Sequence, residues 1–347
     1  MRDLSRRLVH MTNAETTATM HAIRQDTLGG PEVLKLVEVE RPAPGPAEVL
    51  VRVHAAGVNP TDWWHRASGG LTGGAPVPLG WDVSGTIEEV GLGVTRFQAG
   101  DEVYGMPLLP RPAGAYAEFV VSPARHLARK PAGLSHVEAA ALPVAALTAW
   151  QTLVESADVQ EGQRVLIHAA AGGVGHLAVQ IAKARGAYVI GTARAAKHDF
   201  VRALGADEVV DYTQTPFEDA VSDIDIVLDA VGGEYGPRSL KTLRAGGVVL
   251  SIASPEEAAL GPVAAELGLR AVFSIVEPDH AGLSEITALV EAGKLRVAID
   301  TVLPLAEAAK AHEIGESGRT TGKIVLTVAA TATATATATS TAAAPTD

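Results

Sequence analysis

The chain has 347 residues, of which 47% are hydrophobic and 20% are charged, and this length suffices for two domains of roughly 150 residues each. It contains no cysteine, which excludes disulfides, a thiol nucleophile and every zinc site that depends on a thiolate ligand. The 28 Lys and Arg residues against 40 Asp and Glu residues give a net charge of −12, which predicts no nucleic-acid partner.

The two ends of the chain are predicted to be disordered. Residues 1–19 contain Arg2, Arg6 and Arg7 without an apolar segment after them, so they do not resemble a secretory signal. A weak amphipathic transit peptide is the alternative for this extension. Residues 329–347 repeat Ala-Thr and form a low-complexity tail with no large side chain to bury. No apolar run reaches the roughly 18 residues of a membrane span, so we expect a cytoplasmic protein with no membrane partner.

Residues 20–146 are predicted to form a compact, mostly β domain. The segment 49–54, Val-Leu-Val-Arg-Val-His, alternates between apolar and polar side chains in its second half, as a half-buried strand does. Further short strands are expected at 86–90, 101–104 and 116–121. Pro and Gly recur about every dozen residues between these segments, which is typical of turns in such a domain.

A series of strands that alternate with amphipathic helices begins near residue 147. The strands are continuous apolar runs, which is typical of parallel strands buried on both faces. Six are expected within residues 147–276, at 164–169, 188–193, 208–210, 224–231, 247–253 and 269–275. This series predicts an α/β fold with a doubly wound Rossmann parallel sheet, which binds its ligand at the carboxyl ends of the strands.

The segment 277–328 is expected to complete the β domain from the C-terminal side. It contains a predicted helix (283–291), a strand (298–303), a second helix (305–316) and a final strand (323–328). The Rossmann domain is then an insertion into the β domain.

A glycine-rich turn follows the first of the six strands and leads into a helix. It reads Ala169-Ala-Ala-Gly172-Gly173-Val174-Gly175. Glycine lets backbone N–H groups approach a pyrophosphate at a helix N-terminus, where the helix dipole favours an anion. Because a strand precedes the turn and a helix and a second strand follow it, the turn predicts dinucleotide binding by its last four residues. The alternative is a turn that serves only close helix packing.

The end of the second strand indicates which dinucleotide is expected. NAD-binding chains carry an acid there, about 20 residues after the glycine turn, which hydrogen-bonds a ribose 2′-OH. In this chain Thr192 is followed by Arg194 and Lys197 instead, and Tyr212 comes after the third strand. An arginine fork, a lysine charge and a phenol suit a 2′-phosphate, so the expected cofactor is NADP rather than NAD. Alternatively, Arg194 and Lys197 are solvated residues on the first turn of the next helix.

Several further motifs occur along residues 20–328. They are Ala56-Gly-Val-Asn59-Pro-Thr-Asp62, Leu79-Gly-Trp-Asp82-Val-Ser-Gly85, Gly114-Ala-Tyr-Ala-Glu-Phe119, Leu142-Pro-Val-Ala-Ala-Leu-Thr-Ala-Trp150, Asp229-Ala-Val-Gly-Gly233 and Gly322-Lys-Ile-Val-Leu326. With the glycine turn, they resemble the zinc-independent quinone oxidoreductase (zeta-crystallin-like) branch of the medium-chain dehydrogenase/reductase superfamily. The resemblance implies a GroES-like catalytic domain beside the Rossmann domain, and reduction by NADPH of quinones or of double bonds conjugated to a carbonyl.

The resemblance also implies that no zinc is bound. Zinc alcohol dehydrogenases of the same superfamily hold their catalytic metal with a Cys, a His and a second Cys, whose places by motif are Asn59, Trp81 and Val144 here. None of these three can serve as that ligand. Without a Lewis acid, the hydride must go to an acceptor that is already electrophilic, such as a quinone or an enone.

Further cofactor contacts are implied by the same resemblance. Thr148 is expected to bind the nicotinamide carboxamide, and Val231 and Ser254 to lie along the ribose and the ring. Arg319, with Lys323, is expected to close over the cofactor phosphates from the C-terminal segment. The alternative for Lys323 is a solvated place on an edge strand.

Asn59 is the leading candidate to touch both nicotinamide and substrate, since a side-chain amide can donate to an oxygen that gains charge. The alternative is an Asn that serves only the turn before Pro60. Tyr104 and His65 are weaker candidates for the proton donor, with water or the hydroxyls of the cofactor as alternatives. His168, beside the glycine turn, is expected to be a strand residue rather than a catalyst.

Aromatic residues are candidates for the wall of a pocket that binds a flat substrate. Trp63, Trp81 and Phe273 are expected there, with core packing as the alternative for each. Trp64 falls where family members often carry a Tyr that lines the cofactor cleft, and its indole N–H implies no acid function.

The leading hypothesis is an NADPH-dependent quinone oxidoreductase with a small-molecule quinone or enone substrate. An enoyl or 2-alkenal reductase shares the motifs and is the nearest alternative. A non-catalytic NADPH-binding protein or sensor is the alternative of another class. Family members usually pair through the edge strand of the Rossmann sheet, so the apolar strand 269–275 predicts a homodimer.

Overall fold

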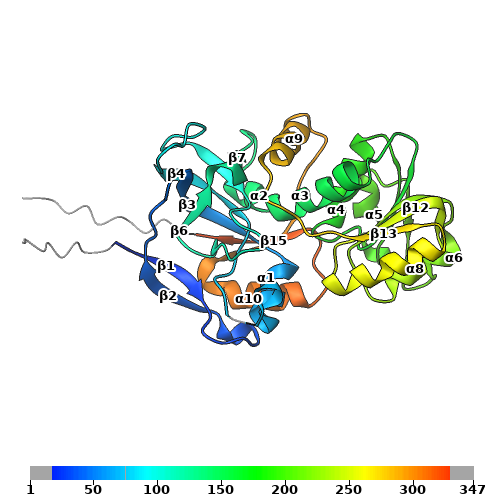
Figure 1. The fold of residues 1–347 in the computed structure, drawn as a ribbon, viewed down its shortest axis with the longest axis horizontal. Helices are drawn as coiled ribbons and strands as arrows, with labels where there is room; N and C mark the ends of the chain where they lie inside the picture. Colours follow the sequence, from blue (N-terminus) through cyan, green and yellow to red (C-terminus); the bar gives the residue numbers. More distant parts are fainter. Residues whose placement is uncertain (1–17, 75, 329–347) are drawn as a thin grey trace, which may run out of the picture.

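The computed structural model describes residues 18–74 and 76–328, and its two halves lie side by side (Figure 1). The first half holds the N-terminal strands together with the last strand, and the second half holds a parallel sheet with helices packed around it. The predictions for residues 1–17 and 329–347 lie outside the described residues. Strand β1 begins at Thr19, one residue inside the extension that was predicted to be disordered.

A seven-stranded sheet forms the core of the first half. Its order is β14-β15-β3-β4-β5-β7, and β6 pairs with β3 outside this path. The strands are β3 (Glu48–Val58), β4 (Val83–Val90), β5 (Glu102–Gly105), β6 (Phe119–Pro123), β7 (Leu127–Arg129), β14 (Ile299–Pro304) and β15 (Lys323–Thr327), beside a separate hairpin of β1 (Thr19–Arg24) and β2 (Lys35–Glu40). Along β3 the expected alternation is present, because Val51 and Val53 are buried while Arg52 and His54 are half-buried.

The C-terminal segment returns to this sheet. β15 pairs antiparallel with β3, with Leu326 opposite Ala56, and parallel with β14. The segment between β14 and β15 contains helix α10 (Ala308–Glu316), which packs against helix α1 (Pro60–Ser68). The first half is therefore built from both ends of the described chain. The exact domain boundaries at residues 146 and 276 stay a prediction.

The second half is a six-stranded, all-parallel sheet. Its strand order is β10-β9-β8-β11-β12-β13. The chain enters the sheet at the central strand β8, runs outward to β10, and then returns to add β11, β12 and β13 on the other side of β8. The strands are β8 (Arg164–Ile167), β9 (Tyr188–Thr192), β10 (Glu208–Val210), β11 (Ile224–Asp229), β12 (Leu243–Ser251) and β13 (Arg270–Phe273). The predicted doubly wound Rossmann sheet of six strands is confirmed. β12 begins at Leu243 rather than at Gly247, because Leu243 pairs with Ile224 ahead of an irregularity in the ladder.

Short helices pack against the strands of both halves. Besides α1 and α10, they are α2 (His136–Ala140), α3 (Pro143–Trp150), α4 (Gly175–Ala184), α5 (His198–Ala203), α6 (Phe217–Ala220), α7 (Tyr235–Leu240), α8 (Leu260–Glu266) and α9 (His280–Glu291). None of the helices in the described segments is long and apolar enough to cross a membrane.

Helix α9 lies where the chain passes back from the parallel sheet to the first half (Figure 1). It begins at His280 rather than at the expected Leu283, because the Asp279 carboxylate accepts hydrogen bonds from the N–H groups of Ala281 and Gly282. The helix packs against both α3 and β7. It is therefore a direct link between the two halves.

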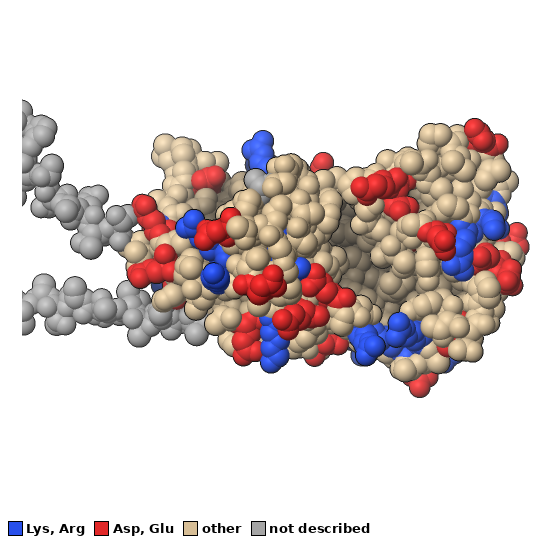
Figure 2. Space-filling model, turned by 90° about the horizontal axis from the view of Figure 1, so that it is seen from below, with Lys and Arg blue, Asp and Glu red and all other residues tan. Residues whose placement is uncertain are grey.

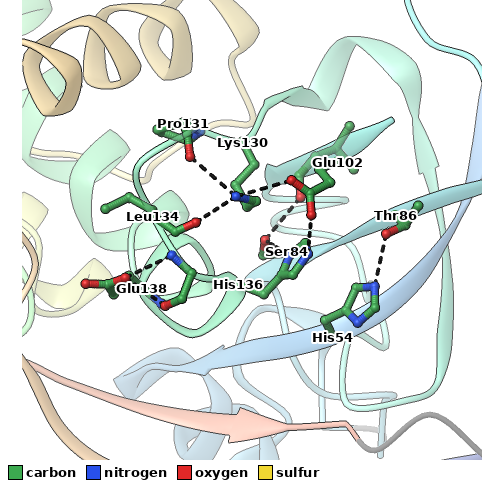
Figure 3. Close-up of polar contacts among 11 residues, drawn as sticks. His54, Ser84, Thr86, Glu102, Lys130, Pro131, Leu134, His136 and Glu138 are labelled. Carbon is green, nitrogen blue, oxygen red and sulfur yellow. Dashed lines mark hydrogen bonds and ion pairs between the residues drawn. The ribbon is translucent and has the colours of Figure 1, made fainter. Parts of the chain in front are cut away.

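A polar cluster holds the start of α2 against the first sheet (Figure 3). The rings of His54 and His136 stack with their centroids 4.3 Å apart. His136 Nδ1 lies 2.8 Å from Ser84 Oγ, and its Nε2 lies 3.1 Å from Glu102 Oε1. Lys130 forms an ion pair with the same Glu102 at 3.3 Å. Because α2 leads directly into α3, this cluster helps to place the α3 residues that reach the candidate site.

Candidate active site

The glycine-rich turn lies at the carboxyl end of β8, where the strand order reverses. Gly172 N–H donates to the Ala169 carbonyl at 2.8 Å, and α4 starts at Gly175. A Cβ on Gly175 would lie 2.3 Å from that same carbonyl oxygen, so this close approach requires glycine. Within the described chain, the N–H groups of Gly173, Val174 and Gly175 have no protein acceptor. Free N–H groups at the start of a helix fit a pyrophosphate.

The basic residues after β9 lie together with the predicted tyrosine. Arg194 Nε donates to Tyr212 Oη at 3.1 Å, and the Arg194 side chain is exposed. Lys197 Nζ donates to the carbonyls of Arg319 and Thr320, at 2.9 and 2.7 Å. The structure thus brings four of the predicted cofactor residues to one place, although Arg319 approaches Lys197 through its backbone.

Sequence reasoning missed Asp211 at this place. Its carboxylate accepts from the backbone N–H of Ala195 at 3.3 Å, and this bond anchors the loop that carries Arg194. Asp211 also accepts from the N–H and the hydroxyl of Thr213, and the hydroxyl contact lowers the pKa of the carboxyl. An Asp directly after a strand with a Thr two residues later is the signal that could have identified this turn.

Figure 2 shows Lys and Arg side chains gathered beside the hollow between the two halves.

The two residues predicted to lie along the nicotinamide follow neighbouring strands, Val231 after β11 and Ser254 after β12. Asp229 Oδ1 accepts from the N–H groups of Val231 and Gly232, at 2.9 and 3.0 Å, which shapes the turn. The Val231 side chain is 45% exposed, so its surface is free for a ligand. Asp229 Oδ2 is buried without a hydrogen-bond partner, and burial raises the pKa of this carboxyl. Ser254, the other residue expected here, donates its hydroxyl to Glu256.

Asn59 is buried at the junction of β3 and α1. Its Nδ2 donates to Asp82 Oδ2 at 2.8 Å, and its Oδ1 accepts from Lys323 Nζ. The other carboxylate oxygen of Asp82 accepts from the backbone N–H of Val144 at 2.6 Å. Four motifs that are far apart in the sequence therefore meet around one carboxylate.

The placement of Lys323 differs from both sequence-based expectations. The residue is only 3% exposed, so it is not a solvated edge-strand residue, and its ammonium faces Asn59 rather than the phosphate turn. Its aliphatic stem faces that turn, because a Cβ added at Gly173 would lie 3.3 Å from Lys323 Cδ. The neighbouring Gly322 N–H donates to the Ala171 carbonyl at 3.0 Å. The stem rather than the ammonium therefore accounts for its contact with the turn.

Asp62 is a second buried carboxyl that sequence reasoning did not assign a role. It accepts from the backbone N–H groups of Asn59 and Gly80, at 2.7 and 3.0 Å. Burial raises its pKa to about 7, and the Asn59 hydrogen bond opposes that shift. The Asn-x-x-Asp spacing is a capping-box pattern and was the available signal. Asp62 therefore fixes the backbone of Asn59.

Two predicted threonines are buried, one in α3 and the other at the end of β9. Thr148 Oγ1 donates to the Val144 carbonyl at 2.6 Å within α3, so its hydroxyl already has a partner as donor. Thr192 closes β9 and its Oγ1 lies 3.2 Å from His168 Nδ1.

The four candidate aromatic residues do not form one wall. Trp81 is fully buried and donates its indole N–H to the Arg111 carbonyl at 2.9 Å, which corrects its expected role in lining a pocket: it is a core residue. Trp63 packs on His312, Trp64 is 37% exposed, and Phe273 lies on β13 in the other half.

The candidate proton donors are engaged in structural hydrogen bonds. Tyr104 is fully buried and its Oη donates to the Leu283 carbonyl at 2.8 Å, which ties β5 to α9. Burial also raises the pKa of this phenol far above its ordinary value. His65 is buried as well, with Nδ1 2.8 Å from the Thr61 carbonyl. His168 lies one residue past β8 with both ring nitrogens bonded, and it fits the structural role that was expected.

Within the described chain, no group of three or more His, Asp or Glu side chains is placed to hold a metal ion. Two surface cavities of about 270 and 390 Å³ lie along α9, and their linings contain none of the predicted site residues. The candidate site is therefore the region between the glycine turn, the Arg194 loop and Asn59.

Comparison with known proteins identifies the family. Residues 45–132 match a family model described as alcohol dehydrogenase GroES-like domain, and residues 204–326 match one described as zinc-binding dehydrogenase. A quinone oxidoreductase of Pseudomonas aeruginosa is 34% identical over 316 residues, which cover 86% of this chain and 96% of that protein. This chain belongs to the quinone oxidoreductase family of medium-chain dehydrogenases/reductases. The predicted family and the GroES-like domain are confirmed.

Solved structures of this oxidoreductase family share the fold. The quinone oxidoreductase of Coxiella burnetii is 37% identical and has a TM-score of 0.86, covering 90% of this chain and 100% of that one. The Escherichia coli quinone oxidoreductase, solved in complex with NADPH, is 29% identical with a TM-score of 0.79, covering 89% of this chain and 100% of that one. One matching family model is named for zinc, whereas this member has no cysteine for the thiolate sites of the zinc enzymes.

Proposed function

We propose that this chain is an NADPH-dependent, zinc-independent quinone oxidoreductase. The observation that carries the proposal is that the backbone N–H groups of Gly173, Val174 and Gly175 have no acceptor within the described chain. The segment after the neighbouring strand β9 carries Arg194 and Lys197 where NAD-binding chains carry an acid. NADPH supplies a hydride when bound, and the residues of this chain bind and orient it.

Each part of the cofactor has residues that fit it. The N–H groups of the glycine turn, with Gly172, suit the pyrophosphate. Arg194, Lys197 and Tyr212 suit the adenosine 2′-phosphate, because a guanidinium and an ammonium can both donate to its oxygens. The residues proposed for the nicotinamide half and for closure of the site are Asn59, Thr148, Thr192, Val231, Ser254 and Arg319.

The proposed acceptor is a quinone or another carbonyl compound with a conjugated double bond. Such a substrate is electrophilic without a metal, and its oxygen gains charge as hydride arrives. The Asn59 amide is the proposed donor to that oxygen. Among the four aromatic candidates, the partly exposed Trp63, Trp64 and Phe273 remain proposals for substrate contacts.

The test is a spectrophotometric assay of NADPH oxidation by the purified protein. We expect oxidation with 1,4-benzoquinone and 9,10-phenanthrenequinone, at higher rates than with trans-2-hexenal. Turnover of the alkenal alone would favour the enone reductase, and binding of NADPH without any turnover would favour the non-catalytic sensor. Incubation with EDTA should leave the quinone rate unchanged, because the proposed chemistry uses no metal.

A homodimer through β13 is part of the same proposal. β13 is an edge strand of the six-stranded sheet; Val272 within it and Ile275 just after it are 42% and 41% exposed. An unpaired edge with apolar side chains favours pairing with a second copy. Sedimentation of the wild type should give twice the chain mass of 35.7 kDa, and V272D should lower it. A wild-type mass near 35.7 kDa would refute the dimer.

A further inference from the structure

The ammonium of Lys323 is buried, and its polar partners within the described chain are oxygen atoms. It donates to the Val58 carbonyl at 3.1 Å and to Asn59 Oδ1, and it pairs with Asp82 Oδ2 at 3.3 Å. The three partners that the described chain gives it are all oxygen acceptors, which suits the three N–H groups of an ammonium. Lys323 and Asp82 are 3% and 0% exposed, so their charges act at short range with little solvent between them.

This surrounding determines which way the Asn59 amide points. Lys323 can only donate, so it faces the amide oxygen, and the Asp82 carboxylate can only accept, so it faces the amide nitrogen. A flipped amide would place donor against donor and acceptor against acceptor. Asp82 is the one acceptor that the described chain offers to Asn59 Nδ2, so the second N–H of that amide remains available for a ligand.

The same contacts also polarise the amide. A cation that donates to the carbonyl oxygen of an amide draws electron density away from its nitrogen, which makes the remaining N–H a stronger donor. A donor of fixed direction that strengthens without reorganisation is what stabilises a substrate oxygen as it gains negative charge. The direction and the polarisation both come from Lys323, 264 residues away in the sequence.

We infer that Lys323 is a positioning residue for the reaction, which orients and polarises the Asn59 amide toward the substrate oxygen. The inference rests on the proposed function. Its structural competitor is a lysine that only supports the glycine turn, because its stem packs against Gly173. The two roles differ in what the loss of the ammonium should change: the first lowers turnover through Asn59, and the second weakens NADPH binding.

A double-mutant cycle separates these roles. K323M retains much of the stem and removes the charge, and N59A removes the amide. We expect each to lower kcat with 1,4-benzoquinone about tenfold, K323M to leave the Kd for NADPH within about twofold, and the double variant to match N59A in kcat. Losses that multiply in the double variant would overturn the inference, as would a fall in NADPH affinity that accounts for the lost activity. K310M, at an exposed lysine of α10, is the matched control and should behave as wild type.

A second readout requires no turnover. The chain has only two asparagines, Asn13 and Asn59, so asparagine-selective 15N labelling yields two side-chain amide pairs. The measurement is an NMR spectrum of the protein without cofactor, in which the signals of the Asn59 side-chain amide are assigned by their loss in N59A. K323M should shift these Asn59 signals and leave the Asn13 signals in place. Asn59 amide signals that do not shift in K323M would refute the contact between Lys323 and Asn59. Wild type that oxidises no NADPH with any acceptor would refute the proposed function, and the spectrum would still report on the contact.

Two further variants serve as controls for misfolding caused by an unpaired buried charge. K323M leaves Asp82 buried without its cation, which can prevent folding. D82N/K323M removes both charges, and K323R keeps the cation. Thermal unfolding identifies which variants fold, and the cycle is then measured with the folded ones. We expect K323R to have a higher kcat than D82N/K323M at equal NADPH affinity. Equal kcat values in these two variants would contradict a role for the cation.

Discussion

Arg66 and Glu316 form an ion pair that joins α1 to α10, with Arg66 Nη2 2.6 Å from Glu316 Oε1. The arginine side chain is only 2% exposed, whereas the glutamate is 34% exposed. The guanidinium also donates to the Gly29 carbonyl at 3.0 Å and lies 3.2 Å from His312 Nδ1. This pair therefore fastens the C-terminal return of the chain to the helix that follows Asn59.

E316A should destabilise the fold, because it leaves the buried Arg66 guanidinium without its carboxylate. Breaking a buried ion pair costs several kcal/mol, and the partial exposure of Glu316 reduces this to about 1–3 kcal/mol. Urea unfolding measures the change. E313A, at an exposed position of the same helix, is the control and should change the free energy of unfolding by less than about 0.5 kcal/mol. Equal effects of the two substitutions would contradict the role of the pair.

R194A should weaken NADPH binding and spare NADH binding. The guanidinium is exposed beside Tyr212, and its proposed partner is the phosphate that distinguishes the two cofactors. Loss of a charge-assisted hydrogen bond predicts a Kd for NADPH that rises by about 10- to 100-fold, with the Kd for NADH within about twofold. R202A, whose arginine pairs with Asp199 on α5, is the control. Wild type with equal affinity for both cofactors would refute the assignment.

Y104F should lower stability and leave turnover nearly unchanged. The substitution removes the hydroxyl that donates to Leu283 and lies 2.9 Å from Thr287 Oγ1, so it weakens the contact between β5 and α9. The expected loss is about 1–2 kcal/mol in the free energy of unfolding. The kcat with a quinone is expected to stay within about twofold, in contrast to N59A. A large fall in kcat at unchanged stability would restore Tyr104 as a proton donor.

Three buried histidines should make the protein sensitive to acid. Burial lowers the pKa of His168 and His312 to about 3 and that of His176 to about 4. Below pH 6.5 the unfolded chain binds protons that the folded chain does not, so the free energy of unfolding falls as the pH drops toward 4. Each histidine adds a slope of up to about 1.4 kcal/mol per pH unit in this window.

Asp62 acts in the opposite direction. Its pKa is raised to about 7, so the folded chain keeps a proton that the unfolded chain releases above pH 3.8, and this contribution to stability is lost as the pH rises to 7. The three histidines outnumber it, and the net trend is acid destabilisation. Urea unfolding at several pH values measures the slope. H168Q should reduce it, and H21Q, at a half-exposed histidine, should not.

Much of the fold could be predicted because its signals are local. A continuous apolar run such as residues 165–167 in β8 is a buried strand wherever it packs, and a glycine turn between a strand and a helix has the same backbone in many proteins. The six parallel strands and the return of β15 followed from such patterns. The start of β12 at Leu243 did not, because its pairing with Ile224 is a contact between strands.

The sequence by itself determined the chemistry available to this protein: no thiolate for zinc, glycines where a pyrophosphate needs backbone N–H groups, and basic residues where NAD-binding chains carry an acid. Only the tertiary structure decided which side chains meet. It placed Trp81 in the core, tied Tyr104 to Leu283 and brought the ammonium of Lys323 to Asn59. The physical reason is that periodicity reports which face of an element is buried, whereas a buried polar group takes its partners from whatever distant segment packs against it.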